Sequence, residues 1–380
     1  MRVLIAGGGT GGHVYPAVSI GKALQEKGAE LLFVGTQRGL EREIVPREGF
    51  EIRFVPVESF PRRLSWKLLR AIATAGAAVR AAGAIVKEFR PHVCIGTGGY
   101  VAGPVVLAAA LQRVPSVIQE QNAVPGLTNR ILSRFADKVA LGYPQAALGF
   151  RVKDKLVVTG NPVRPEIVAL GRAEGARRLG LSAAQRNLLI FGASQGARSI
   201  NEAVLAGLDR LLGLDAHILL ITGPREFPAF VERLRAQRGG VEPWPAGGEG
   251  VRTGNLRALP YVYDMAAALA AADLVVGRAG ALSIAEITAR GLPAVLVPYP
   301  FAAQNHQEKN AAVLAEAGAA VVVPDADLTG ERLAEIVGSL LRDRARLEAM
   351  AAASRRLGRP DAVWDIVALI EGLAAAKARR

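Results

Sequence analysis

Short apolar runs alternate with longer alanine-rich stretches along the whole chain. In the first half, the apolar runs occupy residues 2–6, 31–35, 52–57, 93–96, 114–119, 138–142 and 156–160. The second half repeats the pattern at 187–191, 218–223, 274–277, 294–297 and 320–323. Helical patterns such as 16–28 and 71–89 lie between them. This alternation predicts an α/β fold with right-handed βαβ crossovers and two doubly wound parallel sheets.

Chain length and one proline-rich segment indicate two domains. A chain of 380 residues is long for one core and comfortable for two. The two prolines of 161–165 favour an extended connection. We therefore predict an N-terminal domain over 1–160, a linker at 161–165 and a C-terminal domain over 166–358. The sequence leaves open whether the final helix, 359–380, packs back on the first domain.

Composition excludes several classes of protein. Hydrophobic residues make up 51% of the chain and aromatic residues 5%, which suits a parallel sheet packed by alanine-rich helices. A single cysteine, Cys94, excludes an internal disulfide and fits a reducing compartment. The uncharged stretch 93–111 is interrupted by glycines and by Pro104, so we predict no membrane-spanning helix.

The positive charge is concentrated in the first half. The net charge is +13, and residues 1–160 carry 21 Lys and Arg against 11 Asp and Glu. The remaining residues carry 26 against 23. This asymmetry suits an anionic partner such as a phosphorylated substrate, a nucleic acid or an acidic membrane surface. A general arginine bias with solvated surface charge is the alternative.

Two glycine-rich turns follow short strands, at residues 7–12 and 192–197. A strand, a glycine turn and a helix start together favour anion binding. The first turn also matches GxGxxG, but the second strand lacks the acid that would hold a dinucleotide ribose, so a nicotinamide site is disfavoured. His13 closes this turn. Its imidazole is a candidate general base, or alternatively a helix-capping or phosphate-binding group.

Six short motifs then occur in a fixed order along the chain. They are GTGGH at 9–13, GGYVAGP at 98–104, EQN at 120–122, GNPVR at 160–164, SQGA at 194–197 and GALSIAE at 280–286. Together they closely resemble the MurG family of bacterial N-acetylglucosaminyltransferases over nearly the whole chain. The resemblance implies the GT-B fold, in which two Rossmann-like domains face a deep cleft. It also implies inverting transfer of GlcNAc from UDP-GlcNAc to the C4 hydroxyl of MurNAc in lipid I, giving lipid II.

The resemblance further implies which residues bind substrate. On the donor side these are Ser194, Gln195 and Gly196 for the phosphates, Val262 for uracil, Glu286 for the ribose, Gln307 for GlcNAc, and Ala281, Leu282, Ser283, Arg164 and Asn122 as further contacts. Thr10, Gly11 and Gly12 approach from the acceptor side. Several of these residue types also serve as helix caps or as first-turn acids, and only their order favours function.

The catalytic base is His13 in our first interpretation, with Glu120 as the alternative. Where members of the family often have histidine before Glu-Gln-Asn, this chain has Gln119. Asp325-Ala326-Asp327 matches the DxD motif of metal-dependent glycosyltransferases, but its position favours a solvated turn. We therefore expect no metal and no other cofactor.

A lipid acceptor implies contact with a membrane. Residues 63–72 place apolar and basic side chains on opposite helical faces, and we expect anionic lipid to meet Arg63, Leu64, Trp66, Lys67, Leu68 and Arg70. An ordinary surface helix is the alternative. The resemblance implies a peripheral protein at the cytoplasmic face of the bacterial membrane, with other cell-wall synthesis proteins as an expected class of partner and no nucleic acid.

Two other functions remain open at this point. A UDP-GlcNAc 2-epimerase shares the architecture and the donor but has no lipid acceptor. A non-catalytic nucleotide-sugar-binding protein would not require His13. The basic amphipathic segment and the Gly-Gly-Tyr motif favour the transferase.

Overall fold

The chain forms two compact units. The computed structural model describes residues 1–57, 66–192, 196–244 and 249–378, and gives the backbone alone for 66–75 and 378. The first unit comprises Met1–Val163 together with Asp361–Arg380, and the second comprises Arg164–Pro360. Since the last twenty residues belong with the first unit, that unit is discontinuous in sequence.

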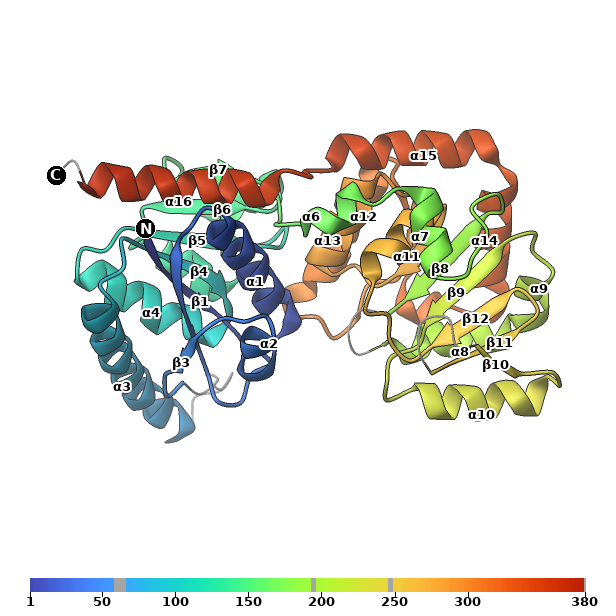
Figure 1. The fold of residues 1–380 in the computed structure, drawn as a ribbon, viewed down its shortest axis with the longest axis horizontal. Helices are drawn as coiled ribbons and strands as arrows, with labels where there is room; N and C mark the ends of the chain where they lie inside the picture. The colour runs from blue at the N-terminus through green and yellow to red at the C-terminus, as the bar shows by residue number, and fades with distance from the viewer. Residues whose placement is uncertain (58–65, 193–195, 245–248, 379–380) are drawn as a thin grey trace. The chain divides into compact units, whose positions relative to one another are not determined.

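The first unit is built on a seven-stranded parallel sheet in the order β3-β2-β1-β4-β5-β6-β7 (Figure 1). Its central strands are buried on both faces, which explains their continuous apolar runs. The strands are β1 (Arg2–Gly7), β2 (Glu30–Gly35), β3 (Ile52–Phe54), β4 (Val93–Gly98), β5 (Ser116–Glu120), β6 (Lys138–Leu141) and β7 (Leu156–Val158).

Helices cover both faces of this sheet. One core cluster joins alternate strand residues to α3 and α4, and another joins the intervening residues to α1 and α16. Helix α16 lies along α1, where Lys27 pairs with Glu371 at 2.8 Å (Figure 1). The helices are α1 (Gly11–Glu26), α2 (Glu41–Arg47), α3 (Trp66–Phe89), α4 (Gly99–Leu111), α5 (Leu127–Leu132), η1 (Pro144–Gly149) and α16 (Ala362–Ala378).

The second unit has an eight-stranded sheet in the order β10-β11-β12-β9-β8-β13-β14-β15. The prediction of an entirely parallel sheet is wrong at one edge, because β10, β11 and β12 pair antiparallel. Strand β10 contains Pro243, and both β10 and β11 carry charged side chains, so neither shows the apolar run that predicts a strand. Proline and charged residues are suited to strands at the edge of a sheet. The strands are β8 (Asn187–Phe191), β9 (His217–Ile221), β10 (Glu242–Trp244), β11 (Gly250–Thr253), β12 (Leu256–Leu259), β13 (Leu274–Gly277), β14 (Ala294–Leu296) and β15 (Ala320–Val322).

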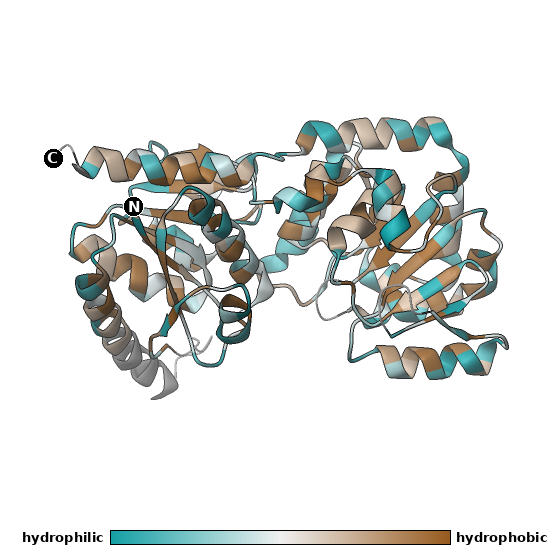
Figure 2. Ribbon diagram, viewed as in Figure 1, coloured by the Kyte–Doolittle hydropathy of each residue, from teal (hydrophilic) through white to brown (hydrophobic). Residues whose placement is uncertain are grey.

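The helices of the second unit enclose the parallel part of its sheet. In Figure 2 the strands are largely hydrophobic, whereas outer helices such as α10 alternate hydrophobic and hydrophilic residues. The elements are α6 (Pro165–Ala169), α7 (Arg172–Arg178), α8 (Arg198–Ala206), α9 (Leu208–Leu212), α10 (Phe227–Gln237), α11 (Met265–Ala271), α12 (Ala281–Arg290), η2 (Ala303–Asn305), α13 (His306–Glu316), η3 (Asp325–Asp327), α14 (Gly330–Arg342) and α15 (Arg344–Leu357). Among the described helices, none has the length and apolar character that a membrane span requires. The predicted α/β class with two Rossmann-like domains is confirmed.

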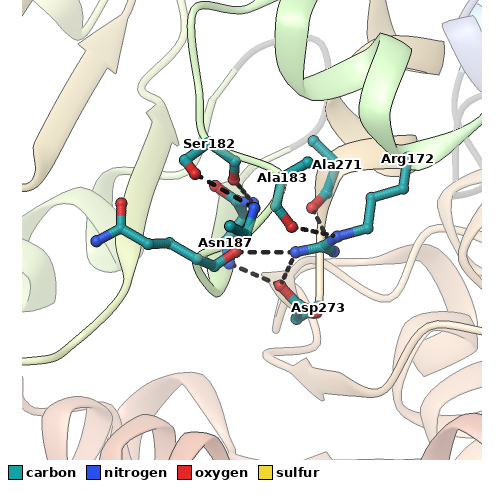
Figure 3. A network of polar contacts seen from close by, with 8 residues as sticks. Arg172, Ser182, Ala183, Asn187, Ala271 and Asp273 are labelled. Atoms are coloured by element: carbon teal, nitrogen blue, oxygen red, sulfur yellow. Dashed lines mark hydrogen bonds and ion pairs between the residues drawn. The ribbon is translucent and has the colours of Figure 1, made fainter.

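A polar network secures the amino-terminal edge of the second sheet (Figure 3). The guanidinium of Arg172 donates to the Asp273 carboxylate at 2.8 Å and to the carbonyl oxygens of Ala183 and Ala271. The same carboxylate accepts the backbone N–H of Asn187 at 2.7 Å. These bonds join α7 to the amino-terminal ends of β8 and β13.

Candidate functional site

In the first unit, the candidate residues gather where the strand order reverses. Strands β1 and β4 are neighbours, and the chain leaves them in opposite directions along the sheet. Helices α1 and α4 begin directly after these strands. In doubly wound sheets, ligands bind beyond the carboxyl ends of the strands at such a point.

The turn after β1 and the start of α4 lie in contact. Gly98 has φ of +106°, and a Cβ there would come within 2.6 Å of His13 Nδ1. Glycine is therefore required both for the backbone conformation and for the room that the imidazole takes. Thr10 and Gly12 are exposed, and Gly11 is half-buried. Helix α1 has no acidic residue in its own first turn.

His13 is held in one tautomer. Its Nδ1 lies 3.2 Å from the carbonyl oxygen of Thr97. Because a carbonyl oxygen can only accept, Nδ1 must carry the hydrogen, and the lone pair of the neutral ring is on Nε2. The Thr97 hydroxyl also donates to the His13 carbonyl oxygen at 2.8 Å. Thr97 thus fixes both the ring and the backbone of His13.

Behind Thr97 lies a buried chain of amide side chains that sequence reasoning missed. Gln121 Nε2 donates to the Thr97 carbonyl oxygen and to Gln119 Oε1. Gln119 Nε2 donates to Asn161 Oδ1 at 2.8 Å, and Asn161 Nδ2 donates to the Gln121 carbonyl oxygen at 2.9 Å. Gln119, at the place where histidine is frequent in the family, is therefore connected through Gln121 to Thr97, the residue of β4 that orients His13. Polar side chains inside otherwise apolar strands were the available signal.

Glu120 is buried and fully engaged within its own loop. Its Oε1 accepts the backbone N–H of Asn122 at 3.0 Å, and its Oε2 accepts from Gly126 N and Asn129 Nδ2. The Asn122 side chain also donates to Oε1, at 3.3 Å. These hydrogen bonds tie the Glu120 carboxylate to the loop and shape residues 121–126. Its predicted role as the alternative base therefore competes with a loop-organising role.

In the second unit, four donor-side candidates lie near the ends of β12 and β13. Val262 is buried in the segment that follows β12. Ala281, Leu282 and Ser283 form the first turn of α12, and this turn contains no acidic residue. The backbone N–H groups of such a turn can meet a polar ligand. The structure therefore brings these residues to the carboxyl ends of the strands, where doubly wound sheets commonly bind ligands.

Arg164 and Glu286 form an ion pair in the second unit. The guanidinium donates to Glu286 Oε1 through Nη2 at 3.0 Å and through Nε at 3.3 Å. Burial raises the pKa of Glu286, and the charge of Arg164 opposes that shift. Both hydrogen bonds go to Oε1, so the carboxylate is oriented by the residue that begins the unit.

Gln307 and the second glycine turn complete the predicted donor side. Gln307 Oε1 accepts the backbone N–H of Tyr299 at 2.9 Å, which ties α13 to the segment after β14. Gly196 has φ of +78° in the turn before α8. Ser194 and Gln195 lie outside the described residues.

The DxD motif is not a solvated turn throughout. Asp325 accepts hydrogen bonds from Ser199 Oγ at 2.7 Å and from the buried guanidinium of Arg278. Arg278 also donates to the carbonyl oxygens of Val297 and Pro298. Ala326 and Asp327 are exposed, and the Asp327 carboxylate lies 3.5 Å from Arg332, whereas Asp325 is half-buried. Over the described part of the chain, no three His, Cys, Asp or Glu side chains converge as metal ligands would.

The predicted membrane residues are only partly described. Arg63 and Leu64 lie outside the described residues. Trp66, Lys67, Leu68 and Arg70 belong to α3, whose backbone alone is given there. A different surface, which we call the α5–η1 patch, combines exposed Leu127, Ile131, Phe135 and Leu148 with the exposed arginines 130, 134 and 151. Arg130, Arg134 and Arg151 line a small hollow there with Leu127 and Ile131.

Both halves of the chain match models of one glycosyltransferase family. Residues 3–141 match the glycosyltransferase family 28 N-terminal domain, and residues 187–366 match its C-terminal domain. The chain is 50% identical, over 97% of its length and 98% of the relative, to the UDP-N-acetylglucosamine–N-acetylmuramyl-(pentapeptide) pyrophosphoryl-undecaprenol N-acetylglucosamine transferase of Moorella thermoacetica.

Two solved structures place the fold. The crystal structure of Acinetobacter baumannii MurG matches with a TM-score of 0.74 and 32% identity, covering 98% of this chain and 99% of that one. A UDP-N-acetylglucosamine 2-epimerase from Listeria monocytogenes, described as putative in its title, matches with a TM-score of 0.69 over 97% of this chain and 95% of that one. Its identity is 15%, so this second likeness shows a shared fold alone.

Proposed function

The chain belongs to the MurG family, within glycosyltransferase family 28, and from this premise we infer that it is the N-acetylglucosaminyltransferase that forms lipid II in peptidoglycan synthesis. It moves GlcNAc from UDP-GlcNAc to the C4 hydroxyl of MurNAc in lipid I, with inversion at the anomeric carbon. The observation that carries this inference is the full-length relationship, which includes both halves of the chain.

The chemistry needs a proton acceptor for the attacking hydroxyl. The acceptor oxygen bonds to the anomeric carbon as the bond to the UDP oxygen breaks, and the hydroxyl proton passes to a base. We assign that base to His13 Nε2, because the Thr97 carbonyl oxygen keeps the hydrogen on Nδ1. Glu120 is the weaker candidate, because its two oxygens are already held by Asn122, Gly126 and Asn129.

The donor is bound by the second unit in this proposal. Glu286 Oε2 accepts from the ribose hydroxyls while Arg164 holds Oε1. The Gln307 amide nitrogen donates to GlcNAc, since its oxygen is engaged by Tyr299. The first turn of α12 and the backbone of Val262 contact the nucleotide. Ser194, Gln195 and Gly196 meet the diphosphate, whose departing charge is stabilised by backbone amides.

Transfer proceeds without an essential metal in this proposal. The Asp325 carboxylate is neutralised by Arg278 and held by Ser199 Oγ, so a cation would have to displace an existing ion pair. The purified enzyme should keep its full rate in excess EDTA. A loss of activity that Mg²⁺ restores would contradict this.

The protein meets the membrane as a peripheral protein in this proposal. The α5–η1 patch supports it, because the exposed side chains of Leu127 and Ile131 line one hollow together with Arg130, Arg134 and Arg151. Apolar side chains that enter the interface and arginines that meet anionic headgroups both favour binding. The localisation follows as the cytoplasmic face of the bacterial membrane, where lipid I is used.

A three-way product assay tests the proposed function. The enzyme is incubated with GlcNAc-labelled UDP-GlcNAc, with and without a lipid I analogue. Label in lipid II, only when acceptor is present, supports the transferase. Free ManNAc would instead indicate an epimerase, and tight UDP-GlcNAc binding without any product would indicate a binding protein.

A further inference from the structure

The first glycine turn is tied down by a carboxylate that belongs to a different part of the first unit. Glu41 is the first residue of α2, a position where an acid is ordinarily exposed, yet its side chain has no exposed surface. Its Oε2 accepts the backbone N–H of Gly9 at 2.8 Å. Its Oε1 accepts the backbone N–H and the hydroxyl of Thr36, at 2.8 and 2.7 Å.

Two glycines next to this carboxylate, Gly8 and Gly39, lie at positions that have no room for a side chain. A Cβ added at Gly8 would come within 2.4 Å of the Glu41 carboxylate, and one added at Gly39 would come within 2.0 Å. The turn after β1 and the loop after β2 thus close around the same side chain. Glu41 therefore fills the space between these two strand ends.

We propose that Glu41 is a positioning residue for transfer, which holds the β1–α1 turn so that Thr10, Gly11, Gly12 and His13 receive the acceptor. This inference rests on the proposed function. Gly9 immediately precedes Thr10, whose carbonyl oxygen accepts the first bonds of α1, from the N–H groups of His13 and Val14. Fixing Gly9 therefore fixes the start of the helix that carries His13.

The carboxylate cannot be replaced by an amide without loss. Two of its three donors are backbone N–H groups, one on each oxygen. In Glu41→Gln, either orientation of the amide points its NH₂ group at one of these N–H groups. A buried donor facing another donor is left without a hydrogen bond, so the turn must shift. We expect this shift to change the acceptor side and to leave the second unit unaltered.

The test compares Glu41→Gln with Glu43→Gln, a control in the same helix whose side chain is exposed. Lipid II formation is measured while acceptor and donor are varied separately, and UDP affinity is measured by calorimetry. We expect Glu41→Gln to raise the acceptor KM and lower kcat, giving a loss in kcat/KM of about 10- to 100-fold. The donor KM and UDP affinity should stay within twofold of the wild type, and Glu43→Gln should be unchanged.

Two results would overturn the inference. One is unaltered kinetics in Glu41→Gln, and the other is a lower kcat with an unchanged acceptor KM, as a smaller fraction of folded enzyme would give. If Glu41→Gln does not fold, the acceptor KM is measured for Thr36→Val instead. This variant removes the hydroxyl that donates to Glu41 and keeps the shape of the side chain. An acceptor KM equal to that of the wild type would then overturn the inference. Failure of the wild type to make lipid II would instead overturn the proposed function.

Discussion

At the scale of single residues, the first unit contains two buried carboxylates that hold loops and one imidazole to which we assign the role of base. Glu41 and Glu120 are both buried, and each accepts backbone N–H groups from a turn at the end of a strand. His13 is half-buried and is oriented through Thr97. The two acids thus hold the loops in place, and in our proposal the histidine is the group that exchanges a proton.

Replacing His13 should remove the base and leave donor binding intact. We expect His13→Ala to lower kcat by about 10²- to 10⁴-fold, the usual contribution of a general base. UDP affinity, measured by calorimetry, should be unchanged, because the residues that we assign to the nucleotide, Val262 and Glu286 among them, belong to the second unit. His92→Gln is the matched control, since His92 lies at the start of β4 and accepts from Arg2 N. A kcat for His13→Ala within threefold of the wild type would exclude this role.

Donor affinity should depend on the ionisation of Glu286. Its ordinary pKa is 4.5, and burial raises it. The folded state therefore holds this proton more tightly than the unfolded chain, so the group costs stability as pH rises from about 4.5 through the raised pKa. The ionised form accepts ribose hydroxyls, so UDP affinity should fall as pH drops through that raised pKa.

Two variants serve as controls for this pH dependence of UDP affinity. In Arg164→Ala the opposing charge is lost, and the fall in UDP affinity should begin at a higher pH. In Glu286→Gln, UDP binding should be weaker and should no longer change across this range. Parallel calorimetric titrations of the three proteins decide. An identical pH profile for the wild type and Glu286→Gln would contradict the assignment of Glu286 to the ribose.

The candidate site could be predicted from sequence only where a motif carried it. His13 and the first turn of α12 belong to contiguous motifs, and the structure places each at the end of a strand. Glu41 and Asn161 were not found, because their importance comes from contacts with residues 32 and 42 positions away. In a single sequence, a buried acid at the start of a helix looks the same as an exposed one.

At the scale of elements, both sheets follow one rule but have different edges. In each sheet the strand order reverses next to the first strand of the unit, between β1 and β4 in one and between β8 and β13 in the other. The helices that follow these strands carry many of the candidate residues. Buried apolar runs made these strands predictable. Strands β10, β11 and β12 were all missed, each being only three or four residues long. In addition, β10 and β11 contain polar residues and pair antiparallel. Their stability comes from pairing rather than from a pattern of their own.

The network at the opposite edge of the second sheet should affect stability alone. Arg172→Ala removes three carbonyl contacts and the ion pair with Asp273 (Figure 3). Because Arg172 is about one-third exposed, we expect a loss of about 1–2 kcal/mol in the free energy of unfolding. Denaturant unfolding measures this. Arg177→Ala, which breaks an exposed pair with Glu174, should give no measurable change. Equal stability in the two variants would refute the role of the network.

At the scale of the whole molecule, the chain is not two consecutive halves. Helix α16 ends the sequence but packs on α1 through buried Val363, Ile366, Val367 and Ile370. The sequence predicted a terminal helix, but its partner could not be read from its own residues. The first unit is therefore completed by the segment Asp361–Arg380, which follows the whole second unit in sequence.

Membrane association should depend on the α5–η1 patch. Reversing the charge of Arg130 and Arg134 by substitution with Glu should reduce sedimentation with anionic vesicles roughly tenfold or more, because each arginine contributes about 1 kcal/mol near such a surface. Arg225 and Arg235 in the second unit are exposed and offer the same charge change as a control. Vesicle binding that is equal in both double variants would exclude this patch as a contact.

The central claim is transfer of one sugar to a lipid-linked acceptor. The most direct measurement follows purified enzyme, labelled UDP-GlcNAc and lipid I, and determines lipid-soluble label, released UDP and the anomeric configuration of the product. We predict one UDP released for each GlcNAc that enters lipid II, with inverted configuration at the anomeric carbon. Label that stays out of the lipid fraction, or a product with retained configuration, would contradict the account.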